Sequence, residues 1–154
     1  MDYTNFSREQ LRTLIESLKA EIADYNRTKI PLSIAMFDID DFKKVNDRKG
    51  HVYGDQVLVD VAALINKSIR DTDLVGRYGG EEFMVIFKEA NLVTASIIAE
   101  RIRKAVEKHI FNEGITITIS GGVKQYEGEN LKDFIHEADK NLYKAKHNGK
   151  NQVI

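Results

Sequence analysis

Three acidic side chains are the residues best placed for chemistry, because the sequence pattern puts each of them where a strand ends. Asp38 follows the run 32–37, which is apolar except for Ser33, and Glu81 and Glu82 stand at the turn of a predicted hairpin. Two like charges about 4 Å apart repel by roughly 4 kcal/mol at an effective dielectric constant near 20, so clustered carboxylates need a proton or a cation. Mg²⁺ suits such a site, since it binds a few protein oxygens and keeps its other positions for water and phosphates. Alternatively, the acids only mark a strand end and a solvated hairpin.

A second group of polar side chains lies in the segment NDRKGHVYGD, across the junction of two predicted helices. It contains Asn46, His51 and Asp55. An amide and a carboxylate close together can read a purine edge, and a carboxylate accepts from N1 and N2 of guanine, which adenine does not offer. Guanine is therefore the better fit. Asn46 and Asp55 also have ordinary structural explanations, Asn46 as a helix-terminal cap and Asp55 as an acid in a first helical turn.

Pairs of lysines four residues apart occur near the C-terminus, at Lys140 and Lys144 and again at Lys146 and Lys150. Residues at this spacing share one face of a helix. Two ammonium groups directed toward a cleft would bind a triphosphate as point charges, although a lysine run on a terminal helix commonly forms a solvated face. The position of the helix in the fold must decide between these interpretations.

The composition limits the remaining possibilities. The 154 residues include 23 basic and 24 acidic side chains, which give a formal net charge of -1, so no global charge favours nucleic acid or an anionic membrane. The absence of cysteine excludes disulfides, thiolate metal sites and a cysteine nucleophile. We find no stretch of membrane-spanning length and no signal peptide. The chain is expected to be soluble and cytoplasmic.

Hydrophobic periodicity predicts an alternation of helices and strands. A plausible capping box of Ser7 and Gln10 opens the first helix. Helices are expected at 7–25, 40–50, 53–70, 93–109 and 131–146, and strands at 32–37, 74–78, 83–87 and 115–120, with an edge strand at 151–154. Strands separated by helices, with one hairpin, indicate an α/β fold in which helices flank a mixed central sheet. No GxGxxG or P-loop motif is present, so any phosphate is bound in another way.

The segment RYGGEEF resembles the GG(D/E)EF signature of the diguanylate cyclase family. The segments PLSIAMFDIDDFKKVNDRKGHVYGDQVL, AERIRKAV, ITITISGGV and ADKNLYKAKHNGKNQV resemble other parts of that family in the same order. Several motifs at proper spacing make chance agreement very improbable. The resemblance implies a single GGDEF domain over residues 1–154, with a lead-in helix within 1–29 and a palm-like nucleotide cyclase core over 30–154.

The resemblance also implies roles for individual residues. Glu81 and Glu82 match the family's catalytic acids. Its metal ligands are matched by Asp38, the carbonyl of Ile39 and Glu81, with Mg²⁺ or Mn²⁺ as cofactor. The substrate-contacting positions correspond to Asn46 and Asp55 for guanine, His51 for the substrate, and Lys43, Lys146 and Lys150 for phosphates. Arg70 and Asp73 match an RxxD product-inhibition site, although Arg70 could instead cap its helix through the dipole, with Asp73 starting the next strand.

The activity implied by the resemblance is the condensation of two GTP molecules into cyclic di-GMP in an antiparallel homodimer. Cyclic di-GMP is also the expected feedback inhibitor, and an upstream sensor or receiver domain is an expected partner. Competing interpretations are a non-catalytic GGDEF domain that binds GTP or cyclic di-GMP, a cyclase with a mixed product, and a plain interaction module. The intact signature argues against the first, Asp55 against the second and the acidic cluster against the third.

Two features depart from the family pattern. The segment DYTNFSRE replaces the usual DxLTGLxNR entry motif, with Thr4 as a counterpart of its threonine and Asn5-Phe6 in place of Gly-Leu. Lys150 stands where arginine is more usual, which keeps the charge but loses the bidentate fork. We therefore expect a weaker grip on the triphosphate rather than inactivity.

Overall fold

The computed structural model describes residues 8–154, so the predicted cap at Ser7 and the departures at Thr4, Asn5 and Phe6 lie outside the described residues. The periodic segments form helices and strands close to the predicted bounds. In chain order they are α1 (Arg8–Thr28), β1 (Ser33–Ile39), α2 (Phe42–Lys49), α3 (His51–Ser68), β2 (Leu74–Gly79), β3 (Glu82–Phe87), α4 (Leu92–Lys108), the 3-10 turn η1 (Asn112–Gly114), β4 (Ile119–Gln125) and α5 (Leu131–His147).

The strands form one sheet in the order β2-β3-β1-β4, in which each of the four pairs antiparallel with its neighbours. A parallel bridge between Gly121 and Val153 adds the C-terminal residues beside β4, where the last segment was expected as an edge strand. The predicted α/β fold with a central sheet flanked by helices is confirmed. The sheet is mixed only through this bridge, because its four strands all pair antiparallel. The apolar run of β1 is explained by its central place, since a strand covered on both faces needs apolar side chains in succession.

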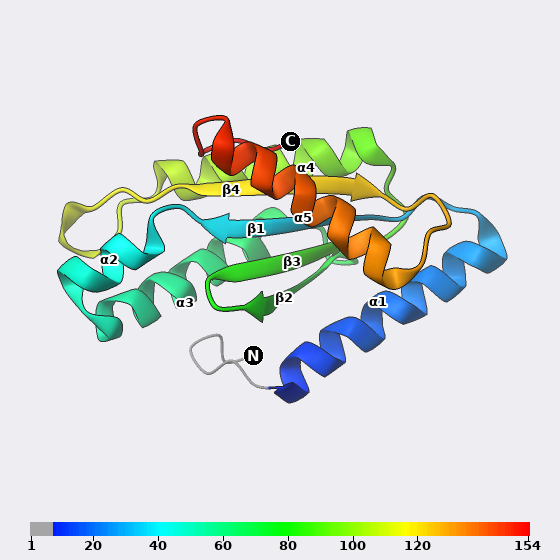
Figure 1. Cartoon of the computed structure of the whole chain (residues 1–154), viewed down its shortest axis with the longest axis horizontal. Coiled ribbons are helices and arrows are strands. Elements are labelled where there is room, and N and C mark those ends of the chain that lie inside the picture. The colour runs from blue at the N-terminus through cyan, green and yellow to red at the C-terminus, as the bar shows by residue number, and fades with distance from the viewer. Residues whose placement is uncertain (1–7) are drawn as a thin grey trace.

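Helices cover both faces of the sheet (Figure 1). Each face supports a separate apolar core. Phe37, Phe83 and Phe87 point to the face covered by α3 and α4, whereas Met36 and Met84 point to the face covered by α1 and α5. Leu14 and Leu18 of α1 are buried in the second core. The alternation follows from the strand period of two. Asp38 and Glu82 share the parity of Met36 and Met84, so they lie on the α5 face.

The fourth strand begins later than the sequence indicates. The predicted strand 115–120 is only partly correct, because β4 runs from Ile119 to Gln125. The residues before it are used otherwise: Ile115 bridges to Phe111 around η1, and the Thr118 carbonyl accepts from the Asp40 amide at 2.9 Å. The strand instead continues through Gly121 and Gly122, which β propensity disfavours.

Close packing explains the two glycines in β4. A Cβ at Gly121 would lie 2.6 Å from the Phe37 ring, and one at Gly122 would lie 2.2 Å from the carbonyl oxygen of Ala138 in α5. Glycine therefore lets α5 rest directly on the strand. Between residues 8 and 154, no helix is both long and apolar enough to cross a membrane.

Candidate active site

The strand register brings two of the predicted acids together. Asp38 on β1 lies directly opposite Glu82 on β3, and directly opposite Ser120 on β4 on its other side. Side chains at directly opposed positions have Cβ atoms roughly 4.5–5.5 Å apart on one face of the sheet. Glu81 occupies the hairpin turn beside them, where its carbonyl accepts from the Ile39 amide at 3.3 Å. The three acids therefore lie at the same end of the sheet, near the C-terminal end of β1.

A lysine from α5 provides the cation at this end of the sheet. The Lys146 Nζ atom lies 2.9 Å from Asp38 Oδ1, 2.8 Å from Asp40 Oδ1 and 3.3 Å from the Ile39 carbonyl oxygen. These oxygens include two of the three predicted metal ligands, Asp38 and the Ile39 carbonyl. They form a set that binds a positive charge, and in this structure the charge is an ammonium group.

The acids do not form a ready-made cage for a metal ion. Within residues 8–154, no group of three or more His, Asp or Glu side chains converges closely enough to hold one. The Asp38 carboxylate is instead directed toward the Lys146 ammonium. The grouping of the three acids around a cation stays a prediction.

The pKa values of two of the acids are raised, as expected where too little positive charge is nearby. Burial raises the pKa of Asp38 above its usual value even though Lys146 opposes the shift. Burial, together with the charges of Asp139, Asp38 and Glu81, raises the pKa of Glu82 from 4.5 to about 7. A cation near these groups would favour their ionised forms, so the electrostatics suit a metal or another cation.

The raised pKa of Glu82 predicts a pH dependence of stability in the metal-free protein. Its folded-state pKa of about 7 exceeds the usual 4.5, so the folded domain loses stability as the pH rises between these values. The shift corresponds to roughly 3 kcal/mol, which partial exposure reduces to about 1–2 kcal/mol. Glu82→Gln is expected to raise the melting temperature at pH 8 by about 2–8 °C relative to the unmutated chain, with much less effect at pH 5. Thermal denaturation in a chelator at both pH values measures this, and an equal gain at both would contradict it.

The corner between α2 and α3 holds the predicted base-contacting residues. Asn46 is near the end of α2, His51 is the first residue of α3, and Asp55 is exposed one turn later. The Oδ1 atom of Asn46 is buried and has no hydrogen-bond partner among the described residues. It packs against Gly54, where a Cβ would lie only 1.8 Å from it. An unsatisfied buried polar atom is rare and calls for a partner, which a bound ligand can supply.

The predicted phosphate-contacting lysines approach the site from two directions. Lys43 is exposed on α2, whereas Lys146 and Lys150 come from the end of α5 and the loop after it. Lys150 Nζ lies 2.6 Å from Oδ1 of Asp41, a residue of the short connection from β1 to α2. The structure therefore brings Lys146 and Lys150 next to the acid-rich segment Asp38 to Asp41, more than a hundred residues away in the sequence.

Comparison with known proteins identifies this arrangement. The GGDEF family profile, described as "Diguanylate cyclase, GGDEF domain", matches residues 10–152. The chain belongs to this family. Over 130 residues it is 48% identical to Diguanylate cyclase A of Treponema denticola, an alignment that covers 81% of this chain and 35% of that protein. The chain spans between 22% and 45% of the length of the curated relatives that it resembles.

Solved structures of GGDEF domains have the same fold. The active GGEEF domain of a diguanylate cyclase from Vibrio cholerae matches with a TM-score of 0.88 at 38% identity, covering 92% of this chain and 93% of that one. The GGDEF domain of DgcB from Caulobacter crescentus, solved in complex with c-di-GMP, matches with a TM-score of 0.87 at 31% identity, covering 92% of this chain and 87% of that one.

The predicted inhibition pair of this GGDEF domain lies away from the acids. Arg70 and Asp73 occupy the turn between α3 and β2. Glu81 lies at the other end of β2, and the usual rise of a strand puts it roughly 20 Å from Asp73. The Arg70 guanidinium contacts the buried Asp73 carboxylate at 2.8 Å and the Lys88 carbonyl at 2.6 Å. The alternative of a helix cap fits Arg101 of α4 better, since its guanidinium donates to the Ser68 carbonyl at the end of α3.

The GGDEF signature did not reveal Asp40, whose buried carboxylate binds several segments around the site. Asp40 is 5% exposed, and its carboxylate accepts from Thr118, Ser120 and the Asn151 amide as well as from Lys146. It thereby joins β1, β4 and the C-terminal loop. The one signal in the sequence was the series of hydroxyls at every second position of ITITIS, of which Thr118 and Ser120 share Asp40 as a buried acceptor.

Proposed function

We propose that this GGDEF domain is the catalytic part of a diguanylate cyclase, which joins two GTP molecules into cyclic di-GMP and releases two pyrophosphates. The observation that carries the proposal is the β1–β3 register, which sets Asp38 opposite Glu82 beside Lys146 and the Ile39 carbonyl. Family membership and the relatives named diguanylate cyclase support it.

The oxygen set at the end of β1 fits a divalent cation. Asp38, the Ile39 carbonyl and Glu81 would hold Mg²⁺ or Mn²⁺, whose bound charge stabilises the α-phosphate and helps to ionise a 3′-hydroxyl. Lys146 now contacts two of these groups, so its ammonium is expected to turn toward the triphosphate when a cation binds. Lys43 and Lys150 complete the phosphate contacts.

The corner of α2 and α3 is the proposed guanine site. The Asp55 carboxylate accepts from N1 and N2 of guanine, the Asn46 amide gains the hydrogen-bond partner that it lacks, and His51 borders the substrate. A carboxylate at this place disfavours adenine, which has no N2 donor. GTP is therefore the proposed substrate.

Gly54→Ala tests the guanine site, because the new Cβ would displace the Asn46 amide from a position 1.8 Å away. Loss of one good base contact, worth about 1–3 kcal/mol, should weaken GTP binding by roughly 5- to 150-fold. Alanine is favoured over glycine within a helix, so the fold itself should persist. Calorimetry with GTP and with tripolyphosphate separates base from phosphate contacts, and Val52→Ala, at an 86% exposed position of the same helix, is the control. Equal losses for both ligands would refute the assignment.

The proposed reaction needs two domains in antiparallel contact. The 3′-oxygen of one GTP bonds to the α-phosphorus of the other, the bond from that phosphorus to pyrophosphate breaks, and the hydroxyl proton passes to Glu81. The same step on the second GTP closes the ring. Holding two bound substrates face to face lowers the entropic part of the barrier. An upstream sensor or receiver domain would regulate this pairing.

The decisive experiment is incubation of the concentrated chain with GTP and Mg²⁺, followed by chromatography of the nucleotides. Cyclic di-GMP and pyrophosphate should form in a one-to-two ratio, at a rate per protein that rises with protein concentration. ATP in place of GTP should give no product. If GTP stayed unchanged at concentrations that force dimerisation, the chain would instead be a nucleotide-binding regulatory domain.

Arg70 and Asp73 are the proposed site of product inhibition. Their ion pair is accessible at the guanidinium, since the Arg70 side chain is 34% exposed while that of Asp73 is fully buried. Arg70→Ala is expected to raise the concentration of cyclic di-GMP needed for half-inhibition by tenfold or more, because a charge-assisted contact of about 1.5–3 kcal/mol is lost. Initial rates across a range of product concentrations measure this effect. Unchanged inhibition in a variant that keeps its uninhibited rate would dismiss the assignment.

A further inference from the structure

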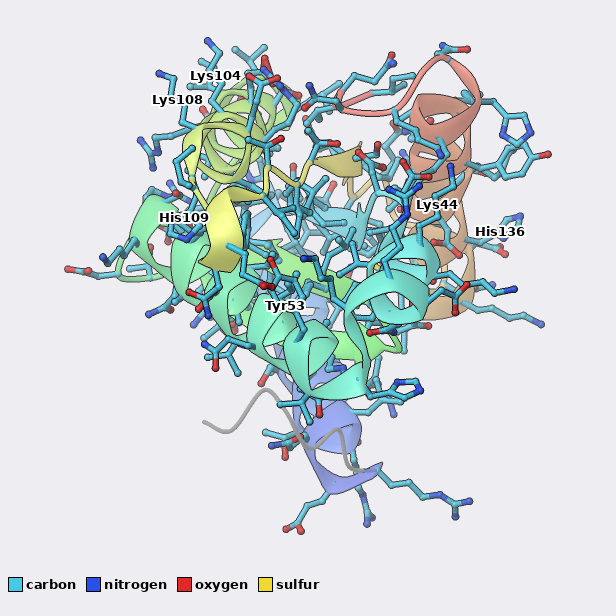
Figure 2. The ribbon with its side chains drawn as sticks, turned by 90° about the vertical axis from the view of Figure 1, so that its left-hand side faces the viewer. Lys44, Tyr53, Lys104, Lys108, His109 and His136 are labelled. Atoms are coloured by element: carbon cyan, nitrogen blue, oxygen red, sulfur yellow. The ribbon has the colours of Figure 1, made fainter. Side chains whose placement is uncertain are left out.

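Asp41 is an acid next to the proposed site to which the family signature assigns no role. It precedes α2 and has a left-handed backbone conformation, with φ 56°. Its position is that of the helix N-cap, yet its side chain makes no capping hydrogen bond. The carboxylate instead lies 2.6 Å from Lys150 Nζ and 3.8 Å from Lys44 Nζ. Figure 2 shows Lys44 on the side of α2 that faces α5.

The ion pair joins partners that both remain in contact with solvent. The side chains of Lys150 and Asp41 are 42% and 43% exposed, so a ligand can reach the ammonium. Lys150 is one of the three lysines assigned to the phosphates, and its ammonium group is paired with an internal carboxylate in this structure.

The backbone places Lys150 without help from Asp41. The Lys150 amide donates to the Ala145 carbonyl at 3.0 Å, and the next amide, of Asn151, donates to the buried Asp40 at 3.0 Å. The Asn151 side chain is also bonded to Arg103 of α4 at 2.8 Å. The loop is therefore held on both sides of Lys150. Removing Asp41 would free the ammonium without releasing the loop that carries it.

We propose that Asp41 sets the affinity of the site for the triphosphate, because it holds the Lys150 ammonium in an internal ion pair that the substrate must break. The proposal rests on the proposed function, in which Lys150 contacts the triphosphate. It identifies Asp41 as a built-in competitor for the substrate's phosphates. Removing this competition should tighten binding.

Asp41→Asn is the test variant, since asparagine tolerates the left-handed conformation and keeps the shape while removing the charge. Calorimetry with magnesium tripolyphosphate should show two- to fivefold tighter binding, the range expected for an exposed ion pair. The same gain should appear with GTP. Asp47→Asn is the control, because it removes one charge from another exposed position of α2. Asp47 forms no ion pair with the described residues, so this variant should change binding less than Asp41→Asn.

A double-mutant cycle separates competition for Lys150 from simple repulsion of the ligand. In a Lys150→Gln background, Asp41→Asn should no longer tighten binding. A gain that persists in this background would overturn the proposal, as would unchanged or weaker binding of tripolyphosphate by Asp41→Asn alone. The proposed function can fail separately: a chain that forms no cyclic di-GMP but shows the full cycle would still have Asp41 as the competitor at an anion site.

Discussion

Glu81→Gln is expected to reduce the formation of cyclic di-GMP from GTP by at least about a thousandfold. Glutamine keeps the size of the side chain but removes the charge that the proposed mechanism uses twice, as a cation ligand and as proton acceptor. Loss of one preorganised electrostatic contact to a transition state commonly costs 10²–10³ in rate, and loss of the base adds to it. Chromatography of the products under saturating GTP and Mg²⁺ measures the effect.

The matched control is Glu127→Gln, an exposed glutamate in the loop after β4 that pairs with Lys124. It should keep the full rate. Both variants should keep the melting temperature of the unmutated chain within a few degrees, since surface substitutions usually change stability by less than about 0.5 kcal/mol. A Glu81→Gln variant with more than a tenth of the original rate would show that this carboxylate is not essential to the chemistry.

Gly122→Ala is expected to destabilise the fold by about 3 kcal/mol or more. The added Cβ would lie 2.2 Å from both the Ala138 carbonyl oxygen and the Leu142 amide nitrogen, which are backbone atoms of α5. Overpacking costs about 1–3 kcal/mol where side chains can yield, and a helix backbone yields less readily. The melting temperature should therefore fall by at least roughly 6–12 °C. Because α5 carries Lys146, its displacement should also lower GTP turnover.

The appropriate control for stability is Gly79→Ala, since a Cβ there meets no atom within 4 Å. Urea denaturation of both variants would compare their free energies of unfolding. If Gly122→Ala unfolded at the same urea concentration as the unmutated chain, α5 would not rest directly on β4, and the positioning of Lys146 would need another explanation.

Local patterns predicted most of the secondary structure because they depend on neighbours in the chain. The helix period located α3, α4 and α5 within a few residues of their observed bounds, and the alternation of apolar runs with glycine turns located the hairpin. The same patterns were only partly correct at β4. The run ITITIS has high β propensity, but the strand extends into Gly121 and Gly122, because α5 and Phe37 approach the backbone too closely for side chains.

Some residues of the candidate site could likewise be predicted from the sequence, and others could not. The family signature named Asp38, Glu81, Lys146 and Lys150, since residue types at fixed spacings are visible in the sequence itself. It did not distinguish Asp40 and Asp41 from their acidic neighbours. The buried bonds of Asp40 reach Thr118, Ser120 and Lys146, and the ion pair of Asp41 reaches Lys150.

By itself, the sequence determined the class of fold, the family and which side chains are available for phosphoryl chemistry, because these depend on composition, period and motif. Only the tertiary structure decided what each acid contacts. It directs Asp38 toward Lys146 rather than into a cage of carboxylates, leaves the Asn46 oxygen without a partner, and pairs Asp41 with Lys150. Contacts of the acids in this site join residues up to 111 positions apart, as between Asp40 and Asn151. Which residues meet over such separations is set by packing of the whole domain rather than by local preference.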